Sequence, residues 1–177
     1  MLKTVWDIVP YGANVLEIAS ATGAISLEIS YKAASILCTD ISERMLAVAR
    51  KKAAKHGVKN IAFRNMDIFD TGQPDSSFDV VIAGQILHLI TEPGKAAAEL
   101  RRVAKSMVIL PMSFTKNLHG MAKVSIGVYR LFGFTPKIEF DAGDFVAFLP
   151  RIGFENCEVI QLSGKIPMAV ALWRKGL

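Results

Sequence analysis

The chain has 177 residues, of which 51% are hydrophobic and 21% charged, and its formal net charge is +5. This length and composition fit one globular domain with a substantial core, and they exclude a disordered or fibrous chain. No uncharged apolar run of about 18 or more residues is present, and the first residues lack the apolar core of a secretory signal, so we expect a single cytoplasmic domain over residues 1–177.

The first 110 residues alternate between predicted strands and predicted helices. Short apolar runs predict strands over residues 15–18, 35–39, 61–66, 78–83 and 107–110, the last closed by Pro111. Helices are predicted over residues 24–33, 43–56 and 93–105. Strand and helix in alternation predict a parallel sheet with helices on both faces.

The remaining residues follow another pattern. Residues 114–134 form a basic, apolar stretch that we expect to be partly helical, and residues 142–151 predict a helix. Two further strands, over 158–162 and 168–173, are expected to pair. The predicted fold is therefore a Rossmann-like, doubly wound α/β domain. It has a mostly parallel seven-stranded sheet, an antiparallel C-terminal strand pair and helices on both faces.

Chemically distinctive residues follow the predicted strands. Ligands of open α/β sheets bind outside the carboxyl ends of the strands. The small residues 19–23 after the first strand let the backbone approach a ligand closely. Asp40 ends the second strand and can accept both hydroxyls of a ribose, and Asp67 ends the third and can accept from an adenine amine. Glu17 precedes the first turn, where it could hold a cationic amine.

Four segments resemble, in order, the motifs of one family. They are VLEIASATG (15–23), CTDISERMLAVAR (38–50), FRNMDIFD (63–70) and FDVVIAGQILHLI (78–90). They are similar to those of class I S-adenosylmethionine-dependent methyltransferases of the ubiquinone/menaquinone-biosynthesis type (methyltransferase type 11). The resemblance runs from about residue 15 to residue 110, and PRIGFENCEVI (150–160) looks like the family's closing strands. It implies S-adenosyl-L-methionine as cofactor, S-adenosyl-L-homocysteine as product, and direct methyl transfer to a small-molecule acceptor.

The same resemblance implies which residues line the cofactor. Residues 17–23 would line its methionine and ribose end, Asp40 would take the ribose hydroxyls, residues 66–68 would hold the adenine with nearby apolar side chains, and residues 83–85 would lie under the sulfonium. The full set is Glu17, Ala19, Ser20, Ala21, Thr22, Gly23, Asp40, Ile41, Met45, Met66, Asp67, Ile68, Ala83, Gly84 and Gln85.

Two departures from the family pattern bear on cofactor binding. The first two glycines of the first motif are Ala19 and Ala21 here. If these positions require positive φ, each alanine costs about 1–2 kcal/mol, and we expect weaker cofactor binding. Family members also carry one or two helices before the first strand. Here about 14 residues precede Val15, so we expect those helices to be short or missing.

His88 is the candidate general base, because it is the only histidine near the ligand edge and imidazole titrates near neutral pH. A packed structural histidine is the alternative. Methyl transfer needs mainly alignment, so the absence of an acid–base pair does not exclude catalysis. No metal site is predicted: Cys38 and Cys157 lie far apart, and we expect both to be buried free thiols.

Three other functions remain open at this stage, as does the oligomeric state. A non-catalytic protein could have kept the fold after its cofactor site weakened. A nucleic-acid methyltransferase would fit the basic helix 43–56, but residues 83–86 lack an Asn/Asp-Pro-Pro-aromatic motif. The glycines of a nicotinamide site would fall on Ala19, Ala21 and Ala24. Residues 114–134 are the expected acceptor-side element, with docking on a membrane surface as a less favoured reading.

Overall fold

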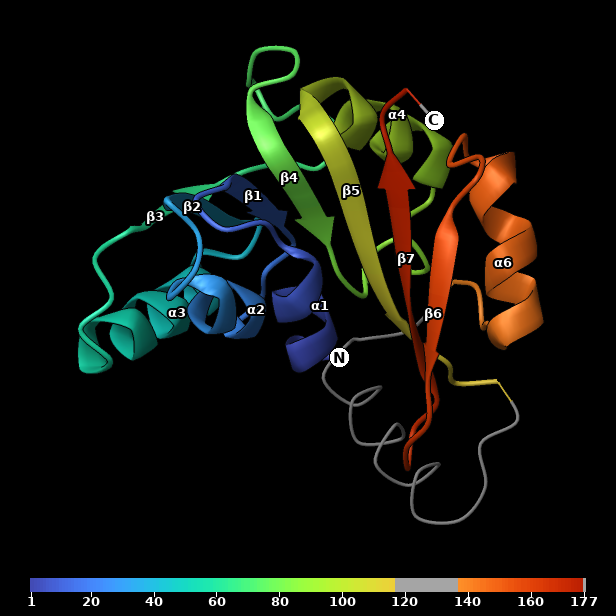
Figure 1. Ribbon diagram of the computed structural model, residues 1–177, viewed down its shortest axis with the longest axis horizontal. Helices are drawn as coiled ribbons and strands as arrows, with labels where there is room; N and C mark the ends of the chain where they lie inside the picture. The colour runs from blue at the N-terminus through green and yellow to red at the C-terminus, as the bar shows by residue number, and fades with distance from the viewer. Residues whose placement is uncertain (117–136, 177) are drawn as a thin grey trace.

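The computed structural model describes residues 1–116 and 137–176. Its sheet has seven strands in the order β3-β2-β1-β4-β5-β7-β6, as Figure 1 shows. The strands are β1 (Asn14–Ile18), β2 (Ser35–Asp40), β3 (Ile61–Asn65), β4 (Phe78–Ala83), β5 (Ala104–Ser113), β6 (Glu158–Leu162) and β7 (Met168–Arg174). The helices are α1 (Leu2–Ile8), α2 (Ala24–Ile29), α3 (Glu43–Lys55), α4 (Pro93–Val103) and α6 (Ala142–Arg151).

Strands β1 to β5 are mutually parallel, and β7 runs antiparallel to both β5 and β6. This arrangement confirms the predicted doubly wound fold with an antiparallel C-terminal pair. The turn between β6 and β7 lies beyond the carboxyl end of β5, at the lower end of the sheet in Figure 1.

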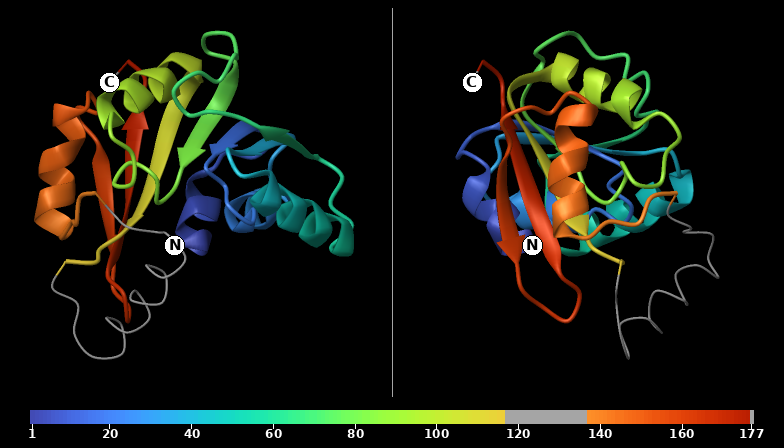
Figure 2. Two further views of the ribbon diagram at one scale, coloured as in Figure 1. Left: turned by 180° about the vertical axis from the view of Figure 1, so that it is seen from behind. Right: turned by 90° about the vertical axis from the view of Figure 1, so that its right-hand side faces the viewer.

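The sheet separates two hydrophobic cores. One contains the buried faces of α4 and α6, and the other contains those of α1 and α2. Figure 2 shows the sheet between these helix pairs. Along β5, Val108, Leu110 and Met112 belong to the first core and Ile109 to the second, as the period of two in a strand requires.

Helix α3 begins at a side-chain cap and packs beside the first loop. The Ser42 hydroxyl accepts the Met45 backbone N–H, which satisfies one of the free donors at the helix start. Leu46, Ala49 and Ala53 form its buried face. Val48, an apolar residue of the same helix, is 41% exposed because it lies to the side of this row.

Strand β5 departs most from the prediction. It starts at Ala104, which is extended and pairs with Phe78, so α4 ends at Val103. It also continues through Pro111 to Ser113. The Pro111 carbonyl accepts a hydrogen bond from the Gln85 N–H, so it points toward the β4 side. In a strand the N–H and C=O of one residue point to the same side, so the N–H that Pro111 lacks would also face β4. The pairing of β5 with β4 ends before this point, at Ile109. A proline there removes no ladder hydrogen bond.

Smaller differences concern α2, β3 and Cys157. Helix α2 ends at Ile29, β3 ends at Asn65, and Cys157 is half-buried rather than buried. Residues 117–134 of the expected acceptor-side element, including His119, lie outside the described residues. None of the helices in residues 1–116 and 137–176 combines the length and hydropathy needed to cross a membrane.

Candidate functional site

The loop after β1 adopts left-handed backbone conformations at alternate residues. Ala19, Ala21 and Gly23 have φ of 55°, 48° and 70°. Side chains disfavour this region, so each alanine carries strain of about 1–2 kcal/mol. The loop therefore has a conformation suited to glycine even at its two alanines. Positive φ at these positions is the condition under which we expected weaker cofactor binding. Strain of this kind tends to occur at functional sites.

Asp40 joins this loop to the start of α3. The residue is 8% exposed; its Oδ2 accepts the Ala21 N–H and its Oδ1 accepts the Ser42 N–H, both at 2.8 Å. The backbone of Ser20 also donates to the Thr39 carbonyl at 2.9 Å. The ends of β1 and β2 thus hold a buried carboxylate against the strained loop, and each of its oxygens can accept a further hydrogen bond.

Glu17 faces α2 within the core. It is 3% exposed, and Oε2 accepts from the Ser26 backbone N–H at 2.9 Å and from the Ser26 hydroxyl. Burial raises the pKa of Glu17 to about 7, with the hydrogen bonds from Ser26 opposing the shift and the charge of Asp40 adding to it. Burial also raises the pKa of the neighbouring Cys38 thiol to about 11, so this cysteine is not a thiolate nucleophile at neutral pH.

The end of β4 lies beside the end of β1, where Ala83 pairs with Ile18. Gln85, two residues later, is also left-handed, with φ of 57°. Its backbone N–H donates to the Pro111 carbonyl at 3.0 Å, and its side chain makes two hydrogen bonds to Ser113. The loop after β4 is thereby fixed across the end of β5.

The residues expected around an adenine divide by exposure. Met66 and Ile68 are buried in the core beneath α4 and α6, whereas Ile41 is 72% exposed and Met45 is half-buried. Asp67 is exposed, and its Oδ1 accepts the Phe69 N–H at 2.9 Å. The exposed faces at this end of the site therefore belong to Ile41 and Asp67.

His88 lies in the loop between β4 and α4. Burial lowers the pKa of its imidazole, which favours the neutral form near pH 7. Its Nδ1 is enclosed and has no hydrogen-bond partner in the described part of the chain, and its carbonyl accepts from Lys137 N at 2.9 Å. A neutral imidazole can accept a proton, but no described carboxylate orients this one.

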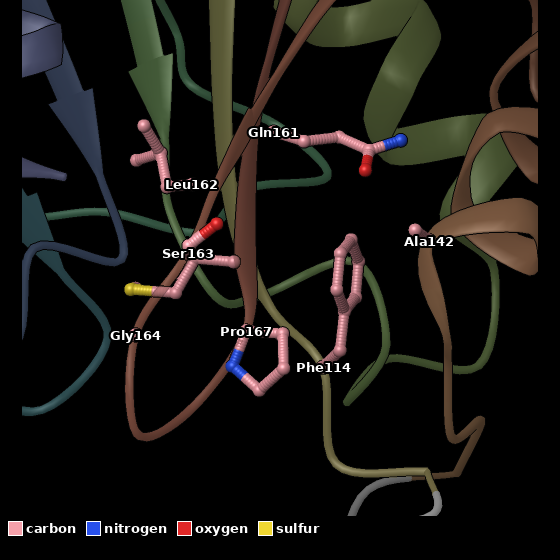
Figure 3. Close-up of a pocket in the computed structure, with 8 residues that line it drawn as sticks. Phe114, Ala142, Gln161, Leu162, Ser163, Gly164 and Pro167 are labelled. Carbon is pink, nitrogen blue, oxygen red and sulfur yellow. The ribbon is translucent and has the colours of Figure 1, made fainter.

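A pocket of about 240 Å³ lies elsewhere on the same edge, between β6, the β6–β7 turn and α6. In Figure 3 the Phe114 ring stands between Pro167 and Ala142. Asp40 and the loop after β1 are not among its lining residues, so this hollow is separate from the residues gathered around Asp40. The buried carboxylate and the strained loop are specific chemical features that this hollow lacks.

Two residues near these groups, Ser26 and Ser113, were not predicted. Ser26 binds Glu17, and Ser113 binds Gln85 from the end of the neighbouring strand. Ser113 follows the predicted end of the fifth strand, so extending that strand past Pro111 would have drawn attention to it. Nothing in the sequence indicates the Glu17–Ser26 contact except that Ser26 is a polar residue in a largely apolar helix.

Comparisons with known proteins identify the family of this chain. The family model of the methyltransferase domain matches residues 11–124. A ubiquinone/menaquinone biosynthesis C-methyltransferase of Marinomonas sp. (strain MWYL1) is 34% identical, with 88% of this chain and 71% of that protein covered. A phosphatidylethanolamine N-methyltransferase of Cereibacter sphaeroides is 30% identical over 67% of this chain. The chain spans 60% of that relative's own length.

The fold is shared with a solved SAM-dependent methyltransferase from Aquifex aeolicus. The TM-score is 0.73 at 20% identity, with 98% of this chain and 88% of that chain covered. The family model covers more than half of the chain, and the Marinomonas relative extends the match through most of it. The chain therefore belongs to the class I S-adenosylmethionine-dependent methyltransferases, of the ubiquinone/menaquinone-biosynthesis type.

Proposed function

We propose that this chain binds S-adenosyl-L-methionine and catalyses transfer of its methyl group to a small organic acceptor. The observation that carries the proposal is the buried Asp40 carboxylate held against the left-handed loop 19–23, at adjacent strand ends. A carboxylate there suits a ribose diol, and a loop of small residues lets a ligand approach the backbone.

The residues fit the cofactor in the following way. Asp40 accepts the ribose hydroxyls through the lone pairs that its two backbone bonds leave free. Ile41 and Met45 cover one face of the adenine, and Asp67, with Met66 and Ile68 below it, accepts the exocyclic amine. Residues 19–23 line the methionine end of the cofactor, and Glu17 supports that loop from the core through its hydrogen bonds with Ser26 of α2. Residues 83–85 lie below the reacting methyl.

When bound, the cofactor supplies a methyl group on a positively charged sulfur that is a good leaving group. The chain then has to align the acceptor with that methyl and keep water away from it. His88 is our candidate to accept a proton from acceptors that must lose one, because the lowered pKa keeps its imidazole neutral.

The acceptor class is proposed from the relatives. Their names specify a quinone-pathway C-methyltransferase and a phosphatidylethanolamine N-methyltransferase, so both act on small molecules rather than on nucleic acid. Arg44, Lys51 and Lys55 lie on the exposed side of α3 and have no ion-pair partner among the described residues. We interpret them as a solvated helix face.

Calorimetric titration with S-adenosyl-L-homocysteine tests the proposal. Asp40→Ala should weaken binding by at least about 1 kcal/mol, the lower range for a charge-assisted hydrogen bond. Asp75→Ala is the matched control, because it removes an equal charge from an exposed residue in the loop before β4. No heat at millimolar ligand with the wild-type chain folded would favour a non-catalytic protein. Equal affinities of wild type and Asp40→Ala would overturn the ribose assignment.

A further inference from the structure

The hydrogen bonds between Gln85 and Ser113 determine which way the Gln85 amide is turned. The Ser113 backbone N–H donates to Gln85 Oε1 at 3.0 Å. A backbone N–H can only donate, so the atom facing it must be the amide oxygen. The amide nitrogen Nε2 then faces Ser113 Oγ at 2.8 Å.

This orientation leaves one hydrogen of the Ser113 side chain available. The Gln85 amide nitrogen has no acceptor capacity, so it donates and Oγ accepts. The hydroxyl therefore keeps its own hydrogen for another partner. Within residues 1–116 and 137–176, no acceptor receives a hydrogen bond from it.

The available hydroxyl lies on the side of the sheet that α2 covers. Met112 and Phe114 belong to the core under α4 and α6, so Ser113 between them points to the opposite face, where α2 lies. A Cβ at Gly84 would lie 3.5 Å from Cδ1 of the α2 residue Ile25 and 3.8 Å from the Pro111 ring, so Gly84 is close to both. The Figure 3 pocket includes Phe114 and lies on the other face, so it is not part of this arrangement.

Holding the loop after β4 in place does not require the Ser113 hydroxyl. The bonds from Ser113 N to Gln85 Oε1 and from Gln85 N to the Pro111 carbonyl already fix the loop. Gln85 nevertheless has a left-handed backbone, which costs free energy. Its amide orients a half-buried hydroxyl beside the proposed methyl position.

We propose that Ser113 donates its hydroxyl hydrogen to an oxygen of the methyl acceptor, and that Gln85 is the residue that positions it. This inference rests on the proposed function, and what it adds is the role of these two residues. The acceptor that it requires has an oxygen at or beside the nucleophilic atom, as a phenol or an enol does. The hydrogen bond stabilises the phenolate or enolate form, and the proton that the acceptor loses passes to the neutral imidazole of His88, the candidate base of the proposed function. The anion's electron pair forms the bond to the methyl carbon, and the pair of the breaking C–S bond stays on sulfur.

Binding of para-nitrophenol in the presence of saturating S-adenosyl-L-homocysteine tests this donor directly. The absorbance of the bound phenolate reports its ionisation as pH is varied. Ser113→Ala should bind the phenolate roughly tenfold or more weakly and raise the pH at which the bound probe ionises, since a hydrogen bond to a charged group is lost. Ser113→Thr should keep both properties. Ser106→Ala, at the opposite end of β5 and exposed, is the control and should match wild type.

Gln85→Glu is the sharper variant, because it is nearly isosteric. One carboxylate oxygen still accepts the Ser113 N–H, but the other now accepts the Ser113 hydroxyl hydrogen, so the donor is lost while the serine remains. Phenolate binding should fall as in Ser113→Ala. Gln73→Glu adds the same charge in the loop before β4 and should have no effect.

The outcomes separate this inference from the proposed function. Failure of the wild-type chain to bind S-adenosyl-L-homocysteine would overturn both the proposed function and the role of Ser113. Normal binding of that product, with the phenolate bound equally by wild type and Ser113→Ala or not bound by wild type, would overturn the role of Ser113 alone.

Discussion

Because the backbone at Ala19 and Ala21 is strained, glycine at either position should increase both stability and ligand affinity. Glycine relieves strain of about 1–2 kcal/mol at each position, and it costs about 0.5–1 kcal/mol in unfolded-state entropy. Ala19→Gly and Ala21→Gly should therefore each raise the free energy of unfolding by up to about 1.5 kcal/mol and tighten S-adenosyl-L-homocysteine binding. Chemical denaturation and calorimetry measure the two effects.

The control for this prediction is Ala47→Gly, in the exposed middle of α3. There the backbone is helical, so glycine should lower stability by about 1 kcal/mol. Destabilisation of all three variants by the same amount would show that the strain at positions 19 and 21 has no energetic consequence.

Glu17 predicts a dependence of stability on pH. Its folded-state pKa, about 7, lies above its ordinary value of 4.5 because of burial. The folded chain therefore binds the proton more tightly than the unfolded chain, so this stabilisation is complete below about pH 4.5 and is lost as pH rises through about 7. The decrease amounts to about 3 kcal/mol at about 1.4 kcal/mol per pH unit.

Urea denaturation of Glu17→Gln across this pH range measures the contribution. Glutamine can still accept from Ser26 but cannot ionise, so its stability should vary less between about pH 5 and pH 8. Glu28→Gln removes an equal charge from the exposed side of α2 and should follow wild type. Identical pH profiles for Glu17→Gln and wild type would contradict the assignment.

At the scale of elements, Gly23 couples the first loop to α3. A Cβ at Gly23 would lie 3.0 Å from the Ala49 Cβ, in addition to the strain of a φ of 70°. Gly57, after α3, has a similar φ of 65° and nothing within 4 Å of its Cβ position. Both alanine variants bear the backbone cost of about 1–2 kcal/mol, but only Gly23→Ala adds a clash of about 1–3 kcal/mol.

Gly23→Ala should therefore be the less stable variant, and it alone should lose S-adenosyl-L-homocysteine affinity, because α3 moves against the loop that Asp40 supports. Thermal unfolding and calorimetry of the two variants make the comparison. Equal effects would mean that α3 does not constrain the loop.

Elements with a strong local pattern were predictable from sequence, and contacts between elements were not. The apolar runs of β1, β2 and β4 predicted both the strands and the residues at their carboxyl ends. The end of β5 was missed because proline usually interrupts a strand, and only the position of β4 shows that its missing N–H is harmless. The Gln85–Ser113 contact joins residues 28 apart and depends on the β4–β5 register, which no local pattern encodes.

At the scale of the whole molecule, the proposed cofactor site consists of residues at the ends of β1, β2, β3 and β4. Those strands contribute to one continuous sheet, so a ligand bound at their ends should stabilise the entire domain. At about a hundredfold excess over its Kd, S-adenosyl-L-homocysteine should add about 2.7 kcal/mol to the free energy of unfolding. For a domain of this size that corresponds to a rise in Tm of roughly 5–10 °C.

Differential scanning calorimetry with two ligands distinguishes the possible cofactors. S-adenosyl-L-homocysteine should raise Tm, whereas NADH should not, because the glycines of a nicotinamide site are replaced at residues 19, 21 and 24. Ala21→Gly should enlarge the ligand-induced rise, since it relieves strain next to the Asp40 contact. A rise with NADH alone would contradict the methyltransferase proposal. A rise with both ligands would show that the site recognises only their shared adenosine, and that the loop after β1 does not select the methionine end.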